Sequence, residues 1–334
     1  MLSRVADSIY WMNRYMERAE NVARFVDVNL HLMLDLPNPG AMQWDALVAT
    51  TGDHEYFKEH YGAPTQDAVL HFLTGDTEYP HSILSCLTAA RENARSVRDA
   101  ISSDMWEQIN RCFLQVREAV AKKAIAESPY EFFNAVKLGC HLFTGVTHLT
   151  MSHNEAWHFG RMARLLERAD KTSRIVDVKY FLLLPDPSYV GSAYDEIQWG
   201  ALLKSASAFE MYRKRFGRIT PPSVMEFLLL DAEFPRAIRF CLRKAERSLQ
   251  AIVGEQSLVT NAASSQLAAL RAEVDGDAID AIIAGGVHQY LDSLQTRINE
   301  VGEAVHDTFF AHAPTMPPPQ PTTTQPARSS QTSQ

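Results

Sequence analysis

Apolar residues recur along most of the chain at intervals of three and four positions, which is the spacing of an α-helix with one buried face. The N-terminal segment shows this best, because one broad arc of its helical projection is apolar: Val5, Ile9, Met12, Met16, Ala19, Ala23 and Val26. No stretch alternates apolar and polar residues between turn pairs, as strands do. The pattern therefore predicts an all-α protein.

Proline residues mark several expected helix starts. Ser128 followed by Pro129 is typical of a helix cap and the first helical residue. Pro80 and Pro235 each follow a short polar turn, and we expect both in the first turn of a helix.

The chain also repeats itself. The segment "YWMNRYMERAENVARFVDV" (10–28) aligns with "GRMARLLERADKTSRIVDV" (160–178). Further along, "VLHFLTGDTEYPHSILSCL" (69–87) aligns with "VMEFLLLDAEFPRAIRFCL" (224–242). Matches over most of two halves indicate a tandem duplication.

These observations together predict a helical bundle built from two tandem, pseudo-symmetric repeats of about 150 residues, at 1–150 and 151–312. Residues 313–334 are rich in Pro, Thr, Ser and Gln and hold too few apolar residues to pack a core. We therefore predict a disordered C-terminal tail.

The repeated helix keeps its charges while its apolar residues change. Arginine or acid recurs at five equivalent pairs: Arg14 and Arg164, Glu17 and Glu167, Arg18 and Arg168, Arg24 and Arg174, Asp27 and Asp177. Apolar positions differ, as in Tyr15 and Leu165. A face that only contacts water would be expected to behave the other way round.

Helix geometry separates the roles of Glu17 and Arg18. Glu17 lies near the centre of the polar arc, whereas Arg18 lies about a quarter turn away, at the edge of the apolar arc. Adjacent residues of a helix do not face each other, so these two do not pair. Arg18 should instead find an acid or carbonyl on a neighbouring helix, because burying an unpaired guanidinium costs several kcal/mol. The same holds for Glu167 and Arg168.

Three interpretations of these charges remain open. They could form ion pairs across the interface between the repeats, surround a cleft that binds an anionic or peptide-like ligand, or lie on a solvated face. The candidate ligand-binding or interface residues are Arg14, Glu17, Arg18, Arg24, Arg164, Glu167, Arg168 and Arg174.

A second basic group lies at Arg91 and Arg95, on one face of another expected helix. Paired arginines can hold a carboxylate or phosphate through two hydrogen bonds. The alternative is an outer face of salt bridges with neighbouring acids.

Composition narrows the classes of function. The net charge of −8 argues against nucleic-acid binding, and no apolar run reaches the ~18 residues of a membrane span. The charged N-terminus is unlike a signal peptide, and the four cysteines form no CxxC pair, so we expect reduced thiols in a cytoplasmic protein. The histidines at 141, 148, 153 and 158 lack the HExxH pattern, and we expect neither a metal site nor a cofactor.

The segments "YWMNRYMERAEN", "MARLLERADKTSRIVDV" and "FPRAIRFCLRKAERSL" resemble the bacterial Alpha-E family, and the resemblance covers residues 1 to 312. The family is all-helical, is named for an ER motif, and is usually duplicated in tandem. Its ER pair would fall on Glu17-Arg18 and on Glu167-Arg168.

The resemblance also implies partners. Members are typically encoded beside circularly permuted ATP-grasp ligase-like proteins, transglutaminase-like proteins and an NTN-hydrolase-type peptidase. It implies a part of a peptide synthesis or modification system, and the interpretation that we favour is an accessory or scaffold protein without catalytic activity of its own. Two alternatives stay open: an enzyme that uses Glu17 or Glu167 as acid or base, with arginines that hold a carboxylate or phosphate, and a homo-oligomeric interaction module.

Overall fold

The computed structural model describes residues 1–35, 41–125, 127–182, 193–254 and 261–311. Every regular element in these ranges is an α-helix, which confirms the all-α prediction for them. The predicted tail at 313–334 lies outside the described residues.

The helices of the first half are α1 (Ser3–Asp35), α2 (Ala41–Ala49), α3 (His54–Tyr61), α4 (Gln66–Thr74), α5 (Ile83–Ser96), α6 (Ser103–Ala121) and α7 (Pro129–Thr150). Those of the second half are α8 (Glu155–Leu182), α9 (Ala193–Ser205), α10 (Phe209–Arg215), α11 (Pro221–Leu230), α12 (Ile238–Val253), α13 (Ala262–Gly276), α14 (Ile279–Gly285) and α15 (Val287–Phe309).

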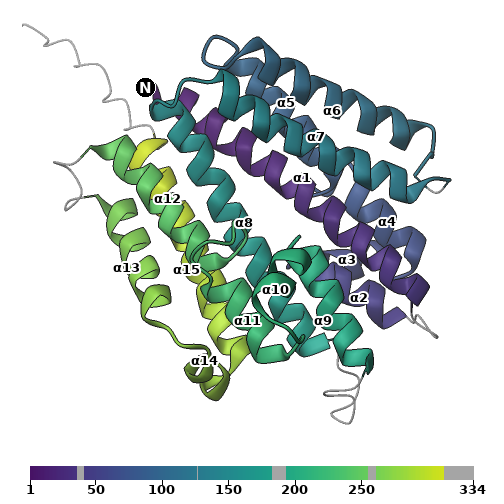
Figure 1. The fold of residues 1–334 in the computed structure, drawn as a ribbon. Coiled ribbons are helices and arrows are strands. Elements are labelled where there is room, and N and C mark those ends of the chain that lie inside the picture. Colours follow the sequence, from purple (N-terminus) through teal and green to yellow (C-terminus); the bar gives the residue numbers. More distant parts are fainter. Residues whose placement is uncertain (36–40, 126, 183–192, 255–260, 312–334) are drawn as a thin grey trace, which may run out of the picture.

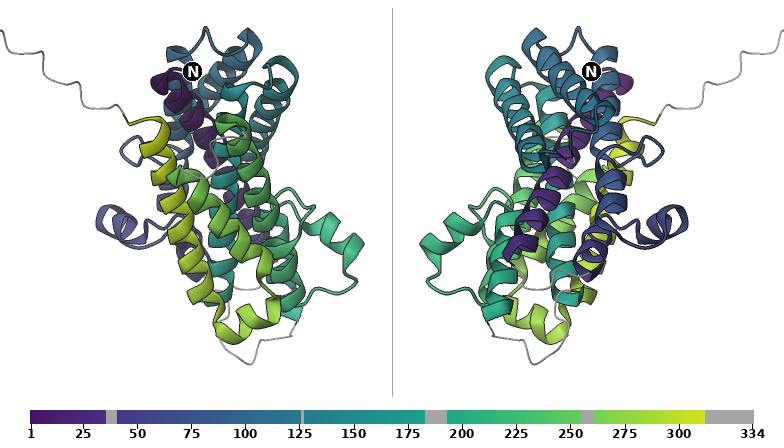
Figure 2. Two further views of the ribbon diagram at one scale, coloured as in Figure 1. Left: turned by 90° about the vertical axis from the view of Figure 1, so that its left-hand side faces the viewer. Right: turned by 90° about the vertical axis from the view of Figure 1, so that its right-hand side faces the viewer.

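The two longest helices, α1 and α8, lie side by side through the middle of the molecule (Figure 1). On one flank α1 packs against α5 and α7, and α6 packs on the outside of both. On the other flank α8 packs against α12 and α15, and α13 packs on the outside of those. The side views show short helical segments of the first half (dark blue) and of the second half (green) projecting on opposite sides (Figure 2).

Each long helix also contacts an element of the other half. Helix α1 packs against α9, and α8 packs against α2, so the exchange is reciprocal. The order of packing partners is therefore similar in the two halves, apart from the extra helix α14 before α15. The division into two repeats remains a prediction from the sequence.

The apolar arc predicted for α1 is buried. Ile9, Met12 and Ala23 have no exposed surface, and Met16 has almost none. On α8, Gly160 faces α1 so closely that a Cβ there would lie 2.6 Å from Asn13 Nδ2. The absence of a side chain at this glycine is what allows the two helices to approach at that point.

The helix starts were predicted in part. Helix α7 begins at Pro129 after Ser128, as expected. The expectation for Pro80 and Pro235 is wrong, because α5 and α12 begin three residues later. The preceding turns are closed by Asp76 and Asp231, whose Oδ1 atoms accept hydrogen bonds from backbone N–H groups two and three residues on. Each proline therefore belongs to an aspartate-closed turn that precedes its helix.

The four cysteines are buried and free, as predicted. Burial raises the pKa of the Cys86 and Cys241 thiols to about 12, so both are protonated at neutral pH. No helix in the described part of the chain is long and apolar enough to cross a membrane.

Candidate functional site where α1 meets α8

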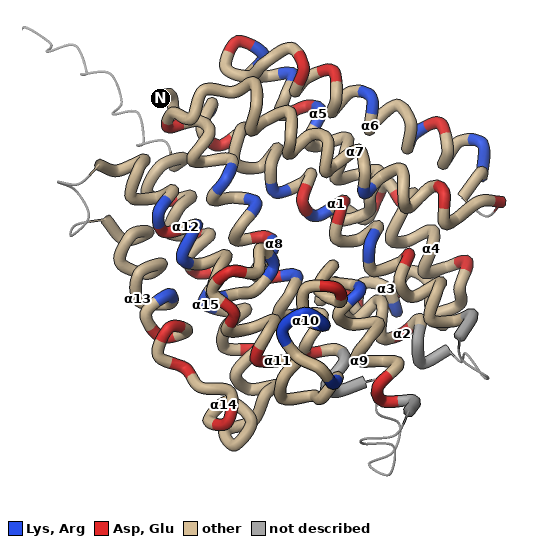
Figure 3. Tube along the Cα trace, viewed as in Figure 1, with Lys and Arg blue, Asp and Glu red and all other residues tan. Residues whose placement is uncertain are grey.

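The charged residues of the two long helices meet in the interior. Figure 3 shows basic and acidic positions interspersed along the middle of α1 and α8, where these helices face each other. Each helix has a buried apolar arc next to a polar arc, so a charge at the border of the arcs points at the neighbouring helix. This placement was predicted for Arg18, and the structure confirms it.

Arg18 binds Glu167 of α8 through two parallel hydrogen bonds. Its Nε lies 2.6 Å from Glu167 Oε1, and its Nη2 lies 2.9 Å from Oε2. The Arg18 side chain is 11% exposed and that of Glu167 is fully buried. The third nitrogen, Nη1, donates to His81 Nδ1 at 2.7 Å. Such paired contacts combine charge with fixed geometry and are among the strongest hydrogen bonds in proteins.

Arg14 of α1 also binds Glu167, with its Nε 2.8 Å from Oε2. Lys171, one turn further along α8, has its Nζ 3.9 Å from Glu167 Oε1 and 3.2 Å from Asp170. The Glu167 carboxylate is therefore surrounded by three cations. We call this group, with His81, Asp170 and Arg174, the Glu167 side.

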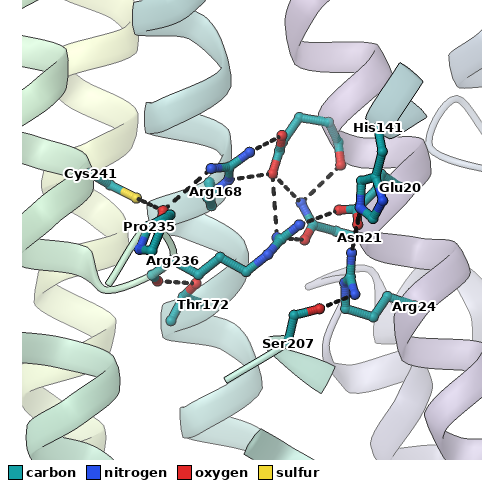
Figure 4. A network of polar contacts seen from close by, with 11 residues as sticks. Glu20, Asn21, Arg24, His141, Arg168, Thr172, Ser207, Pro235, Arg236 and Cys241 are labelled. Atoms are coloured by element: carbon teal, nitrogen blue, oxygen red, sulfur yellow. Dashed lines mark hydrogen bonds and ion pairs between the residues drawn. The ribbon is translucent and has the colours of Figure 1, made fainter. Parts of the chain in front are cut away.

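The reverse contact is present as well. Arg168 of α8 binds Glu17 of α1 with Nε 2.7 Å from Oε1 and Nη2 2.8 Å from Oε2. Arg168 Nη1 also donates to the carbonyl of Pro235, in the turn before α12 (Figure 4). The two ER pairs are thus reciprocal: each arginine binds the glutamate of the opposite helix.

The second cation at Glu17 comes from the turn before α12 rather than from α8. Arg236 Nη1 lies 3.4 Å from Glu17 Oε1 and 2.8 Å from Asn21 Oδ1, and its Nη2 lies 2.7 Å from Glu20 Oε2. Figure 4 shows Arg236 reaching from its own segment to Glu20 and Asn21 of α1. We call Glu17, Glu20, Arg24, Arg164, Arg168 and Arg236 the Glu17 side.

Each side has a second acid that pairs with an arginine four residues later. Glu20 forms an ion pair with Arg24, which also donates to Ser207 Oγ. Asp170 pairs with Arg174 at 3.0 Å. His141 of α7 closes the Glu17 side, with Nε2 3.1 Å from Glu20 Oε1 and 3.2 Å from Arg24 Nη2.

The arginines determine the ionisation of the two glutamates. Burial by itself would raise the pKa of Glu17, but the charge and hydrogen bonds of Arg168, together with Arg236 and Arg164, lower it to about 2. The pKa of Glu167 is held well below its usual value, because Arg18 and Arg14 outweigh the effect of burial. Both carboxylates are therefore charged at neutral pH.

Burial and the nearby arginines together favour the neutral form of both histidines. They lower the pKa of His81 to about 4, through burial first and then Arg18. They lower the pKa of His141 to about 4 as well, through burial, Arg24 and Arg236. Both histidines are therefore neutral near pH 7.

Arg164 differs from all the other cations at this interface. It corresponds to Arg14 in the sequence alignment, and it is 8% exposed. Its Nη1 is buried without a hydrogen-bond partner, and no ion pair to it is found among the described residues. Burial, followed by the charge of Arg168, lowers its pKa to about 10, so it remains protonated at neutral pH.

A cavity lies on each side. The cavity of the Glu17 side has a volume of about 160 Å³ and is lined by Arg164, Arg168, Arg236, Glu17 and Thr144, among others. The cleft of the Glu167 side is larger, about 780 Å³, and Arg14, Arg18, His81, Lys171 and Arg174 are among its lining residues. No group of three or more His, Cys, Asp or Glu side chains that could hold a metal ion occurs within the described ranges.

Most of the predicted site residues are thus brought together. Arg14, Glu17, Arg18, Arg24, Arg164, Glu167, Arg168 and Arg174 all lie where α1 faces α8 or one turn beyond. Arg91 and Arg95 do not join them. Both pair with Glu92 on α5, and Arg91 also donates to Asn110 of α6. These contacts match the alternative of a salt-bridged outer face.

Sequence reasoning missed five partners: Glu20, Asp170, Lys171, His81 and Arg236. Glu20 and Asp170 are acids at equivalent positions of the repeated helix, so the criterion used for the arginines would have found them. His81 and Arg236 are also equivalent, but their types differ, and no retained charge marked them.

The arrangement agrees with a comparison to known protein families. The model of the Alpha-E family, described as a predicted alpha-helical domain with a conserved ER motif, matches residues 1–310. The chain belongs to the Alpha-E family. In this Alpha-E protein two reciprocal Glu-Arg pairs join α1 to α8, at the positions where the resemblance places the ER motif, Glu17-Arg18 and Glu167-Arg168.

Similar proteins include an uncharacterised protein of Mycobacterium bovis and one of Mycobacterium tuberculosis, each 24% identical over 274 residues. The match covers 75% of this Alpha-E protein but only 30% of each relative. The chain thus spans less than a third of the length of these curated relatives. No solved structure matches it.

Proposed function

We propose that this Alpha-E protein is a non-catalytic accessory or scaffold subunit of a bacterial peptide synthesis or modification system. Its partner is an ATP-grasp-type amide ligase, with a transglutaminase-like protein in the same system. The proposal assigns it to the cytoplasm, where ATP is available to the ligase. The observation that supports it most directly is the state of the two ER glutamates.

Both glutamates are fully engaged. Glu167 accepts from Arg18 and Arg14, and Glu17 accepts from Arg168 and Arg236. A general acid or base works best when its pKa lies near the operating pH. Glu17, with a pKa of about 2, is a very weak base and carries no proton to donate. This argues against the alternative of an enzyme that uses Glu17 or Glu167 in proton transfer.

The cysteines give no better basis for catalysis. Burial raises the pKa of Cys140 well above its usual value, and that of Cys112 to about 11. A nucleophilic cysteine needs the opposite, a lowered pKa in an accessible position. A rigid helical body held by ion pairs suits a protein that positions another protein or its substrate.

The length of the relatives is in keeping with such a role. In the mycobacterial proteins the matching region is joined to a larger remainder of the same polypeptide. A region that acts together with another protein in one organism can be part of one chain with a second region in another. The proposal extends this reasoning to a separate ligase as the partner.

The test begins with the tagged protein expressed at native level in its own host. We expect an ATP-grasp-type ligase to co-purify in stoichiometric amount. The purified ligase is then assayed for ATP hydrolysis and amide-bond formation while the Alpha-E protein is added stepwise. A change in turnover or product that saturates near equimolar protein supports the proposal.

Two controls separate this role from the alternatives. Heat-unfolded protein should leave ligase turnover unchanged. The isolated chain should not convert ATP and candidate substrates, and a turnover that is lost in Glu17→Gln would favour the enzyme alternative instead. Absence of a co-purifying ligase, together with unchanged turnover of an added ATP-grasp ligase from the same host, would overturn the proposal.

A further inference from the structure

The feature that the ion pairs do not explain is Arg164. A buried guanidinium without a partner costs several kcal/mol, so proteins rarely keep one unless something else binds it. Arg164 lies in the middle of α8, and its side chain lines the cavity of the Glu17 side. Its Nη1 has no hydrogen-bond partner there.

The equivalent arginine shows that the position can be satisfied by protein. Arg14 donates to Glu167 at 2.8 Å, and it has a further contact with Tyr10 at 3.3 Å. The corresponding acid for Arg164 would be Glu17. Arg236, in the turn before α12, occupies that place, because its Nη1 reaches Glu17 and its Nη2 reaches Glu20.

The charged side chains of the Glu17 side do not balance one another. Four arginines, Arg24, Arg164, Arg168 and Arg236, face two carboxylates, Glu17 and Glu20, which leaves a surplus of two positive charges. His141 adds no charge near pH 7, since its pKa is about 4. The pKa of Arg24 is lowered to about 9, through burial and then Arg236.

The cavity is also reachable from solvent. Its lining includes His141 and Thr144 of α7, and the His141 side chain is 54% exposed. The volume of about 160 Å³ has room for several water molecules, and hence for one small charged group. The cavity is too small for a whole peptide.

We propose that this cavity binds a single oxyanionic group, a phosphate or a carboxylate of a small molecule, with Arg164 as the principal donor. Guanidinium groups match both oxyanions through paired N–H donors. Arg168 and the Thr144 hydroxyl lie in the same lining and are the additional donors. The surplus of two charges favours the phosphate dianion. The proposal does not depend on the ligase partnership.

The experiment uses the purified full-length protein and measures binding by isothermal titration calorimetry. Inorganic phosphate and acetate are titrated separately at constant ionic strength, with chloride as the reference salt. We expect saturable one-to-one binding of phosphate. The affinity should fall at least about ten-fold in Arg164→Met, because hydrogen bonds to a charged group are lost. Arg95→Met, which changes an exposed arginine of α5, is the matched control and should bind like wild type.

Thermal unfolding gives a second readout. Phosphate should raise the melting temperature of the wild type, because a ligand that binds only the folded state stabilises it. It should not raise that of Arg164→Met. Without added anion, Arg164→Met should melt at the same temperature as wild type or higher, since the substitution breaks no ion pair.

Three results would overturn the proposal. One is the absence of saturable binding of either anion to the wild type. Another is equal affinity in Arg164→Met, which would assign the anion to a different site. A lower melting temperature or failure to fold in Arg164→Met without anion would mean that Arg164 already has a partner in the protein. Tighter binding of acetate than of phosphate would identify a carboxylate as the ligand group.

Discussion

The Glu167 side and the Glu17 side are built from equivalent positions, yet only one of them satisfies all its cations. At the Glu167 side, Arg14 and Arg18 both bind Glu167, and Lys171 and Arg174 bind Asp170. At the Glu17 side, Arg168 and Arg236 bind Glu17, and Arg164 is left without an acid.

The two sides differ because the residue type changes at two pairs of equivalent positions. Position 21 of α1 is Asn where α8 has Lys171, and position 236 is Arg where the first half has His81. The extra cation of the Glu17 side therefore comes from the turn before α12, and it reaches the carboxylate that Arg164 would otherwise bind. The comparison teaches that both sides keep the reciprocal pair between α1 and α8, while the supporting cation can come from a different segment of the chain.

The largest expected effect is the loss of stability when either glutamate is replaced, and it should differ between the two. Glu167→Gln leaves Arg14, Arg18 and Lys171 with little compensation, and we expect it to lower the free energy of unfolding by about 5 kcal/mol. Glu17→Gln should cost less, about 3 kcal/mol, because Arg236 keeps Glu20 and Asn21. Urea unfolding of both variants measures the difference. Equal losses would mean that the two sides do not differ energetically.

For the paired arginines we expect the Glu17 side, rather than the Glu167 side, to lose more stability. Arg168→Ala leaves Arg236, at 3.4 Å, as the cation in ion-pair contact with Glu17, and we expect a loss of about 3 kcal/mol. After Arg18→Ala, Glu167 still has Arg14 at 2.8 Å, so the loss should be nearer 2 kcal/mol and lower the melting temperature by about 5 °C. Calorimetric melting of the two variants tests the order, and an unchanged melting temperature for Arg18→Ala would contradict a structural role for the pair.

The two histidines give a smaller effect that depends on pH. A histidine whose pKa is about 4 in the folded protein and near 6.5 when unfolded takes up its proton more readily after unfolding. Stability should therefore fall as the pH drops from about 6.5 to about 4. Below about 4.5, the lowered pKa of Glu17 adds a further loss.

Melting temperatures between pH 7 and pH 4 test this for each side. His81→Gln should flatten the dependence more than His141→Gln, because the exposed His141 is better screened by solvent. His60→Gln, on the exposed face of α3, serves as the control and should keep the wild-type slope. A wild-type profile that is flat over this range would disprove the role given to both histidines.

The smallest effect is expected on the outer face of α5. The Arg95 side chain is 66% exposed and pairs with an exposed Glu92. Surface ion pairs contribute little, so Arg95→Ala should change the free energy of unfolding by less than about 0.5 kcal/mol. Urea unfolding of Arg95→Ala and Arg168→Ala under the same conditions compares their free energies of unfolding. A large loss in Arg95→Ala would mean that the outer face has an unrecognised contact.

The sequence predicted the helices well because helical spacing is a local property. The apolar arc from Ile9 to Ala23 is buried as expected, and the border position of Arg18 required a partner on another helix. The identity of that partner could not be predicted, since the sequence does not show which acid of another helix lies beside Arg18. The choice depends on how the helices lie in space.

The unpaired state of Arg164 was also beyond sequence reasoning. It follows from Arg236, which is far away in the chain and lies in the turn before α12. Pro80 and Pro235 were misplaced because the aspartate that closes each preceding turn acts over several residues. Contacts of this kind depend on tertiary geometry rather than on spacing.

The reciprocal pairs between α1 and α8 also set a condition on biosynthesis. Arg18 and Glu167 are 149 residues apart in the chain. At about 5–20 residues per second, α1 leaves the ribosome roughly 7 to 30 s before its partner exists. During that time Arg14 and Arg18 lack Glu167, the acid that both bind in the folded protein, so the emerging first half cannot bury them as ion pairs. Completion of the core is thus delayed until the second long helix has been made.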